Sequence, residues 1–159
     1  KTPAITKATH CTRFTLMPES AVIVHATCIA FDGKGALIVG SSGAGKSALA
    51  LQLMAYGCQL VADDRTMLVA RDGRLTASPA PHLSGLIEAR GVGILAADHA
   101  AEAQVDMAID MEQCELERLP TLRHREICGI SVACLHKVEA PYFPAAVLQY
   151  LKGSRREPI

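Results

Sequence analysis

Short apolar runs, separated by Gly, Pro and Asp-Gly turns, dominate the hydrophobic pattern of this chain. Runs in which apolar side chains alternate with small or polar ones indicate β-strands, because successive side chains of a strand face opposite sides. Asp32-Gly33 and Asp72-Gly73, each between two such runs, indicate β-hairpins. The pattern predicts strands at 13–17, 20–31, 36–39, 58–62, 65–70, 74–77, 92–96, 104–111 and 126–135.

Helical patterns are fewer. Residues 47–56 are apolar on nearly all sides, which predicts a helix buried by several neighbours. A short helix is predicted over 83–89 and an amphipathic helix over 141–151. The charged segment 112–125 is predicted to be a loop. Many hairpin strands with few helices favour an α/β fold built on a mixed sheet rather than a doubly wound parallel sheet.

The length of 159 residues is typical of one domain. We expect residues 1–159 to form a single P-loop domain, with a compact core over 13–151. Residues 1–12 and 152–159 are expected to be flexible ends.

The segment between the strand at 36–39 and the helix at 47–56 fits the phosphate-binding pattern G-x-x-x-x-G-K-[ST] in full. Its glycines let backbone N–H groups close around an anion, and the following helix adds the positive end of its dipole. Lys46 is expected to reach the β- and γ-phosphates, and the Ser47 hydroxyl to bind Mg²⁺. The pattern therefore predicts binding of ATP with Mg²⁺. The predicted nucleotide-binding residues are Gly40, Ser41, Ser42, Gly43, Ala44, Gly45, Lys46 and Ser47.

Two consecutive carboxylates, Asp63 and Asp64, follow the buried strand predicted at 58–62. P-loop enzymes need a further carboxylate for Mg²⁺, usually at the end of such a strand. Adjacent side chains there face opposite sides, so one aspartate can face the metal while the other faces elsewhere. Either could accept the proton of an attacking hydroxyl. An acidic pair in a solvated turn is the alternative interpretation.

Three other residues support no functional claim singly. His25, within an apolar strand, is by itself most simply a core histidine. Glu88 is by itself a solvated charge at a helix end, and Arg118 a surface arginine in a charged loop.

Charge and cysteine content narrow the class of protein. The 16 basic and 16 acidic residues cancel, so nothing suggests a nucleic-acid footprint or an electrostatic membrane anchor. No apolar run approaches the ~18–20 residues of a membrane-spanning helix. The six cysteines include no C-x-x-C pair, which favours reduced, buried thiols in a cytoplasmic protein over disulfides or a zinc site.

Taken together and in this order, His25, the P-loop, the Asp63-Asp64 pair and L-I-E-A-R-G-V-G-I at 86–94 resemble the catalytic domain of bacterial HPr kinase/phosphorylase. That family combines a G-x-S-G-x-G-K-S P-loop with a D-D pair and an E-x-R-G-[LV]-G signature. Its catalytic domain is related to the phosphoenolpyruvate carboxykinase P-loop fold, so the resemblance implies that fold here. The resemblance is good over residues 20–120 and poor beyond them.

The resemblance implies an ATP-dependent serine kinase whose substrate is an HPr-type phosphocarrier protein of the phosphotransferase system. Asp64 would be the base that accepts the seryl proton. Asp63 would assist the metal waters or orient the site. The implied catalytic residues are Asp64, His25, Lys46, Arg118 and Asp63, and the implied metal ligands are Ser47, Glu88 and Asp63. The family also implies a homohexamer.

Two departures from the family pattern are visible. The sequence is similar to short alphaproteobacterial forms, which lack the additional N-terminal domain of the usual member. The Gly-Arg-Asn loop that the family associates with dephosphorylation has no clear counterpart, because residues 124–130 stand at that point. The kinase residues are present, and the reverse, phosphorylase reaction is left open. The alternative functions are a small-molecule P-loop kinase and a nucleotide-binding regulatory module without catalysis.

Overall fold

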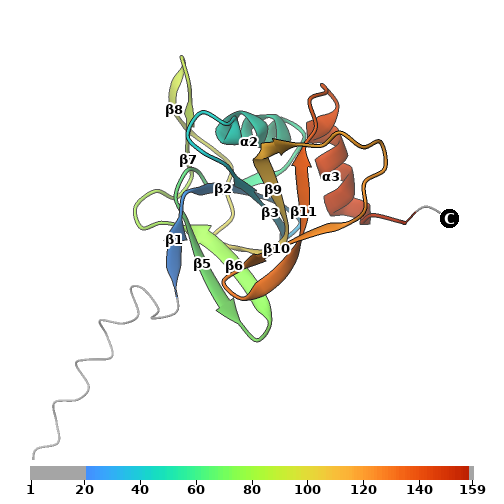
Figure 1. Cartoon of the computed structure of the whole chain (residues 1–159). Coiled ribbons are helices and arrows are strands. Elements are labelled where there is room, and N and C mark those ends of the chain that lie inside the picture. Colours follow the sequence, from blue (N-terminus) through green and yellow to red (C-terminus); the bar gives the residue numbers. More distant parts are fainter. Residues whose placement is uncertain (1–20, 158–159) are drawn as a thin grey trace, which may run out of the picture.

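The computed structural model describes residues 21–157, which form a curled mixed sheet with two helices on one face (Figure 1). The strand predicted at 13–17 lies outside the described residues. The strands are β1 Val22–Val24, β2 Ala26–Phe31, β3 Lys34–Val39, β4 Gln59–Ala62, β5 Thr66–Arg71, β6 Arg74–Pro79, β7 Leu86–Ala89, β8 Gly93–Ala96, β9 Ala103–Cys114, β10 Arg123–Ile127 and β11 Ile130–Lys137. The helices are α2 Lys46–Ala55 and α3 Phe143–Gly153.

The main sheet has the strand order β1-β5-β6-β9-β3-β2-β4 and branches at β9. Strand β9 runs parallel to β3 along one edge, and its other edge is shared by antiparallel β6 and parallel β11. Strands β7 and β8 form a separate hairpin, which projects at the upper left of Figure 1. The prediction of a mixed α/β sheet rich in hairpins is confirmed.

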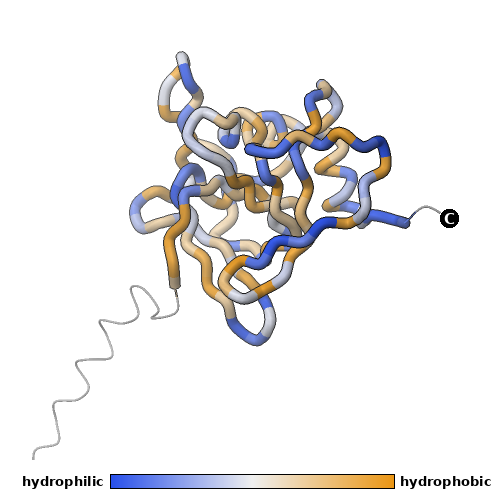
Figure 2. The backbone as a smooth tube through the Cα atoms, viewed as in Figure 1, coloured by the Kyte–Doolittle hydropathy of each residue, from blue (hydrophilic) through white to orange (hydrophobic). Residues whose placement is uncertain are grey.

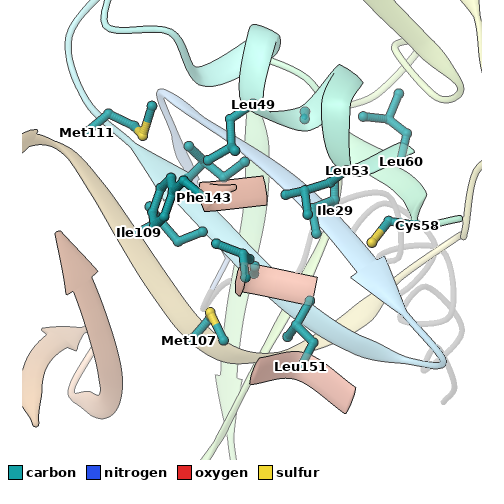
Figure 3. Packing of buried hydrophobic residues seen from close by; sticks show 14 of the residues in the cluster. Ile29, Leu49, Leu53, Cys58, Leu60, Met107, Ile109, Met111, Phe143 and Leu151 are labelled. Atoms are coloured by element: carbon teal, nitrogen blue, oxygen red, sulfur yellow. The ribbon is translucent and has the colours of Figure 1, made fainter. Parts of the chain in front are cut away.

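Both helices cover the same face of the sheet. Ile29 of β2 and Ile109 of β9 point to this face and are buried against Leu53 of α2 and Phe143 of α3 (Figure 3). Burial of each such side chain stabilises the fold by roughly 1.5–3 kcal/mol. This core fixes α2, and therefore the loop that precedes it, against the central strands.

The opposite face of the sheet carries a second core. Cys28 and Leu37 of the central strands pack there with Leu68 of β5 and Leu75 of β6, because the curl brings these outer strands over the face. Figure 2 shows hydrophilic residues instead at the tip of the β5–β6 hairpin. The sheet thus covers one of its own faces, which explains why so few helices suffice.

The strand predicted over 20–31 is two strands that meet at His25. Strand β1 pairs with β5, where Val24 lies opposite Thr66, whereas β2 pairs with β3 and β4. One straight strand cannot keep both sets of partners on a curled sheet, so the chain bends at His25. The bend places the histidine at a corner, with its side chain half exposed.

The prediction of a helix over residues 83–89 is wrong. Residues 86–89 form β7, which pairs antiparallel with β8. Ile87 and Ala89 are buried while Leu86 and Glu88 are exposed, and this period of two is that of a strand. The preceding residues 81–85 form turns.

The boundaries near the C-terminus also differ from those predicted. Strand β9 continues to Cys114, because β11 pairs with it as far as Lys137 opposite Cys114. The single strand predicted over 126–135 is the hairpin β10–β11, which turns at Cys128 and Gly129, both with positive φ. The loop predicted over 112–125 is therefore limited to 115–122.

Helix α3 matches the amphipathic helix predicted over 141–151 and ends at Gly153. Beyond it, Arg155 donates a hydrogen bond to the carbonyl of Pro120. Neither helix of the described range 21–157 is long and apolar enough to cross a bilayer. All five cysteines in that range are free: Cys28, Cys58 and Cys134 are buried as expected, and Cys114 and Cys128 are exposed.

Candidate active site

The P-loop leaves β3 at Gly40 and enters α2 at Lys46. Gly45 is the N-cap residue of α2, has φ 97°, and gives the helix no side-chain cap. The first N–H groups of α2 are thus free of a side-chain partner and available to an anion. A Cβ on Gly40 would lie 3.0 Å from the Cβ of Ala44 and 3.2 Å from that of Met111, so the loop is closely packed.

Lys46 folds back over the loop that contains it. Its Nζ donates to the carbonyl of Gly40 (2.9 Å) and to that of Ser41 (3.0 Å), and the residue is only 6% exposed. These contacts hold the ammonium group at the mouth of the P-loop. A triphosphate bound to the loop would meet it there.

Asp63 lies beside Ser47 and accepts three hydrogen bonds. Its Oδ1 accepts from the Ser47 hydroxyl (2.6 Å) and from the Thr27 hydroxyl (3.1 Å). Its Oδ2 accepts from the backbone N–H of Glu88 (3.0 Å). Three donors on different elements fix this carboxylate next to the P-loop serine.

Asp64 points the other way. Its Oδ1 lies 3.3 Å from Nδ1 of His25, and both side chains are about half exposed, 57% and 51%. Its backbone has φ 67°, a left-handed conformation that is uncommon for residues other than glycine. The tight turn therefore directs the two consecutive carboxylates to different partners, as the strand-end position predicted.

Thr27 connects the two aspartates and is absent from the predicted site. Its hydroxyl donates to Asp63 Oδ1 and accepts from the backbone N–H of Asp64 (3.1 Å). The residue is fully buried. The only signal in the sequence is a polar residue within an otherwise apolar run of β2.

Glu112 is a second residue of the site that was not predicted from the sequence. Its Oε2 accepts from the N–H (2.6 Å) and the hydroxyl (2.5 Å) of Ser41. These hydrogen bonds, helped by the charge of Lys46, hold the pKa of Glu112 below its usual range. The carboxylate anchors the first turn of the P-loop to β9.

Lys46, Ser47, Asp63, Asp64, Thr27 and His25 form what we call the P-loop cluster. Within the described residues, Glu88 contacts this cluster, whereas Arg118 does not. Glu88 reaches Asp63 through its backbone N–H, and its side chain is exposed on β7. Arg118 lies in the exposed loop 115–122, and no hydrogen bond or ion pair found within residues 21–157 joins it to the cluster. The structure thus brings together Lys46, Ser47 and Asp63 at the P-loop and Asp64 with His25, whereas Glu88 joins them only through its backbone and Arg118 makes no polar contact with them among the described residues.

The donor set suits Mg²⁺ held jointly with a nucleotide. No three His, Cys, Asp or Glu side chains of the described residues form a ready-made metal site. A P-loop Mg²⁺ needs less, because a hydroxyl, a carboxylate, waters and phosphate oxygens complete its shell. Ser47 and Asp63, joined by a hydrogen bond of 2.6 Å, are a hydroxyl and a carboxylate that could fill these two places.

A cavity of about 600 Å³ opens beside this cluster on the sheet face opposite the helices. Its lining includes His25 and Ser41, and its wall carries the ion pair between Asp110 and Arg125 (3.3 Å). We call it the histidine-side cavity.

A family model described as the HPr serine kinase C-terminal domain matches residues 17–138, which include all of these groups. The chain belongs to this family. The resemblance noted from His25, the P-loop and the aspartate pair is therefore confirmed.

Relatives of the HPr kinase family agree with this assignment. The HPr kinase/phosphorylase of Streptococcus thermophilus is 49% identical over 73 residues, which are 45% of this chain and 24% of that protein. The one from Lactococcus lactis subsp. lactis is 40% identical over 103 residues, 60% of this chain and 33% of that protein. The chain thus spans no more than about a third of these relatives.

A solved structure supports the fold over most of the HPr kinase domain. The Hpr(Ser) kinase/phosphatase from Coxiella burnetii superposes with a TM-score of 0.70 at 28% identity. The match covers 82% of this chain and 94% of that one.

Proposed function

We propose that this domain is an ATP-dependent serine kinase that phosphorylates an HPr-type phosphocarrier protein. One observation carries the proposal. A continuous set of hydrogen bonds leads from the P-loop serine, Ser47, through Asp63 and Thr27 to Asp64, which faces His25. The groups needed to hold a triphosphate and to receive a proton are thereby fixed to one another.

The P-loop side of this set would bind and orient the nucleotide. Lys46 and the free N–H groups of α2 would hold the β- and γ-phosphates. Ser47 and Asp63 would bind Mg²⁺, with Glu88 at the exposed edge. When bound, Mg²⁺ would neutralise the negative charge of the phosphates during transfer.

Asp64 would act on the acceptor. The seryl oxygen attacks the γ-phosphorus, the bond to the β,γ-bridging oxygen breaks, and ADP departs while the seryl proton passes to the Asp64 carboxylate. The exposure of Asp64 leaves room for an entering hydroxyl, and His25 steadies the carboxylate at 3.3 Å. The role that the resemblance implies for Arg118, steadying the charge of the transferred phosphate, would fall to the exposed loop 115–122 that carries it.

The proposal also covers the reverse reaction, the location of the enzyme in the cell and its oligomeric state. The relatives are named kinase/phosphorylase, so the reverse transfer from phosphoserine is a second reaction to measure. A cytoplasmic enzyme is supported by the free cysteines found among the described residues. The homohexamer implied by the family resemblance completes the proposal.

Incubation of the purified protein with ATP, Mg²⁺ and the HPr-type carrier tests the function. We expect one phosphoserine on the carrier, none on the carrier's acceptor Ser→Ala variant, and none with Lys46→Met enzyme. The same incubation is repeated with the nitrogen-branch paralogue of the carrier as a second candidate substrate. If ATP binds but neither carrier is labelled, a small-molecule kinase or a regulatory module is the better description. Adding inorganic phosphate or pyrophosphate to phosphorylated carrier measures the reverse reaction.

A further inference from the structure

Two hollows border the P-loop, and they lie on opposite faces of the central sheet. The histidine-side cavity meets the loop at Gly40 and Ser41. A second hollow, of about 370 Å³, meets the loop at Gly45 on the face covered by the helices. We call this second hollow the α2 groove, because it runs along that helix past Ala48 and Gln52.

The catalytic groups show which hollow receives which substrate. Asp63 and Asp64 directly follow β4. Strand β7 contacts α2, and its Glu88 N–H donates to Asp63, so the β7–β8 hairpin lies on the aspartate side of the P-loop. His25 lines the first cavity. The γ-phosphate must face these groups, so the other end of the nucleotide must leave the P-loop away from them. The α2 groove is bounded by β9 and by the segment between β11 and α3, and it contains none of the predicted catalytic residues.

The groove has the chemistry of a nucleoside site. Leu49, Met111 and Phe143 are buried side chains of the helix-side core (Figure 3). All three line the groove and give it an apolar wall. Gly45 and Ala48 carry little or no side chain, which leaves the helix side of the groove open to a flat ring. Lys137, ion-paired with Glu139 at 3.6 Å, stands at the rim. Apolar walls with a few polar groups at the edge are typical of ligand pockets.

We infer that the α2 groove binds the nucleoside of ATP, with the base against Leu49, Met111 and Phe143. This inference rests on the proposed function. Each hollow then has one substrate: the α2 groove receives the nucleoside, and the histidine-side cavity remains free for the acceptor. Gln52 also lines the groove, about 10 Å beyond Gly45 by the rise of a helix, and its amide would be available to the edge of the base.

Filling the groove tests the inference. Ala48→Phe introduces a ring at an exposed position of α2 that lines the groove, and Ala55→Phe introduces the same ring on the same helix outside it. Binding of MgATP and of Mg-tripolyphosphate, which lacks a nucleoside, is measured by calorimetry for both variants. We expect Ala48→Phe to weaken MgATP about tenfold or more and to leave tripolyphosphate within about twofold. Ala55→Phe should bind both ligands as the wild type does.

Unchanged MgATP binding by Ala48→Phe would overturn the inference, and so would equal weakening of both ligands. Photolabelling of the wild type with 8-azido-ATP gives a readout that needs no variant. Label within 48–53 or 137–144 supports the groove, and label within β1, β5 or β10 refutes it. A wild type that binds neither MgATP nor tripolyphosphate would instead refute the proposed kinase function, so the two failures are distinguishable.

Discussion

Replacing Thr27 with valine removes one hydroxyl from the centre of the site while nearly preserving side-chain shape. That hydroxyl donates to Asp63 and accepts from the backbone N–H of Asp64, and Thr27 is fully buried. Thr27→Val therefore leaves a backbone N–H without its partner and removes one of three donors from the Asp63 carboxylate. The matched control is Thr27→Ser, which keeps the hydroxyl and loses only a methyl group.

The magnitudes separate the two variants. A buried N–H left without a partner costs about 1–3 kcal/mol, and the N–H of Asp64 is only partly buried, which places its cost at the lower end. The lost hydrogen bond to Asp63 adds about 1 kcal/mol. We expect Thr27→Val to lower the free energy of unfolding by about 2 kcal/mol, which for a chain of this size lowers Tm by about 4–8 °C. Thr27→Ser loses one buried methyl group, about 1 kcal/mol. Misplacement of both carboxylates should slow transfer by Thr27→Val about ten- to hundredfold.

Urea unfolding and carrier phosphorylation, measured on wild type and both variants, check this reasoning. The expected order of stability is wild type, Thr27→Ser, Thr27→Val. If the serine variant is the less stable of the two, packing of the methyl group outweighs the hydrogen bonds, and the stabilising role of the Thr27 hydroxyl is refuted. Wild-type transfer by Thr27→Val would show that Thr27 does not position the aspartates.

Three further predictions follow from individual side chains. Asp64→Asn should abolish phosphoryl transfer but leave MgATP affinity within about twofold, since the carboxylate faces His25 rather than the P-loop; equal transfer by the variant would move the base role elsewhere. The pKa of Glu112 is lowered in the folded protein, so its carboxylate contributes stability above its unfolded pKa and loses it as pH falls. The Tm advantage of wild type over Glu112→Gln should therefore hold from pH 7 to about pH 5 and shrink as pH falls further through the lowered folded pKa, and a difference that stays constant down to about pH 3 would contradict this expectation. Burial raises the pKa of the Cys28 thiol to about 12, so alkylation at pH 8 followed by peptide mass spectrometry should modify Cys114 and Cys128 and spare Cys28.

The P-loop and the aspartate pair were predictable because their chemistry is local. Glycine positions, the strand before the loop and the helix after it stand in one short segment, and the carboxylates directly follow a buried strand. The different orientations of Asp63 and Asp64 were also predicted, although the structure produces them by a tight turn after β4, with Asp64 at φ 67°, rather than by strand alternation. Family resemblance added His25 and Glu88, whose roles no local pattern indicates.

The remaining contacts depend on pairings between distant segments. Thr27 and Asp63 are 36 residues apart, and Ser41 and Glu112 are 71 apart. A buried threonine or a charged residue after an apolar run gives no sign of such a partner. The error at residues 86–89 has the same origin: the strand is defined by its partner β8, whereas the isolated segment fits one turn of helix equally well.

Strand β9 has one further consequence. Met111 lines the α2 groove. The next residue, Glu112, lines the histidine-side cavity and accepts a hydrogen bond from the Ser41 hydroxyl. A single peptide bond therefore separates the wall of one hollow from the wall of the other. A shift of this strand on filling one hollow would therefore reach the other, and the resulting change in affinity would be reciprocal. Binding of the nucleotide and binding of the acceptor would then be coupled through the backbone of β9, without a lid that closes over either one.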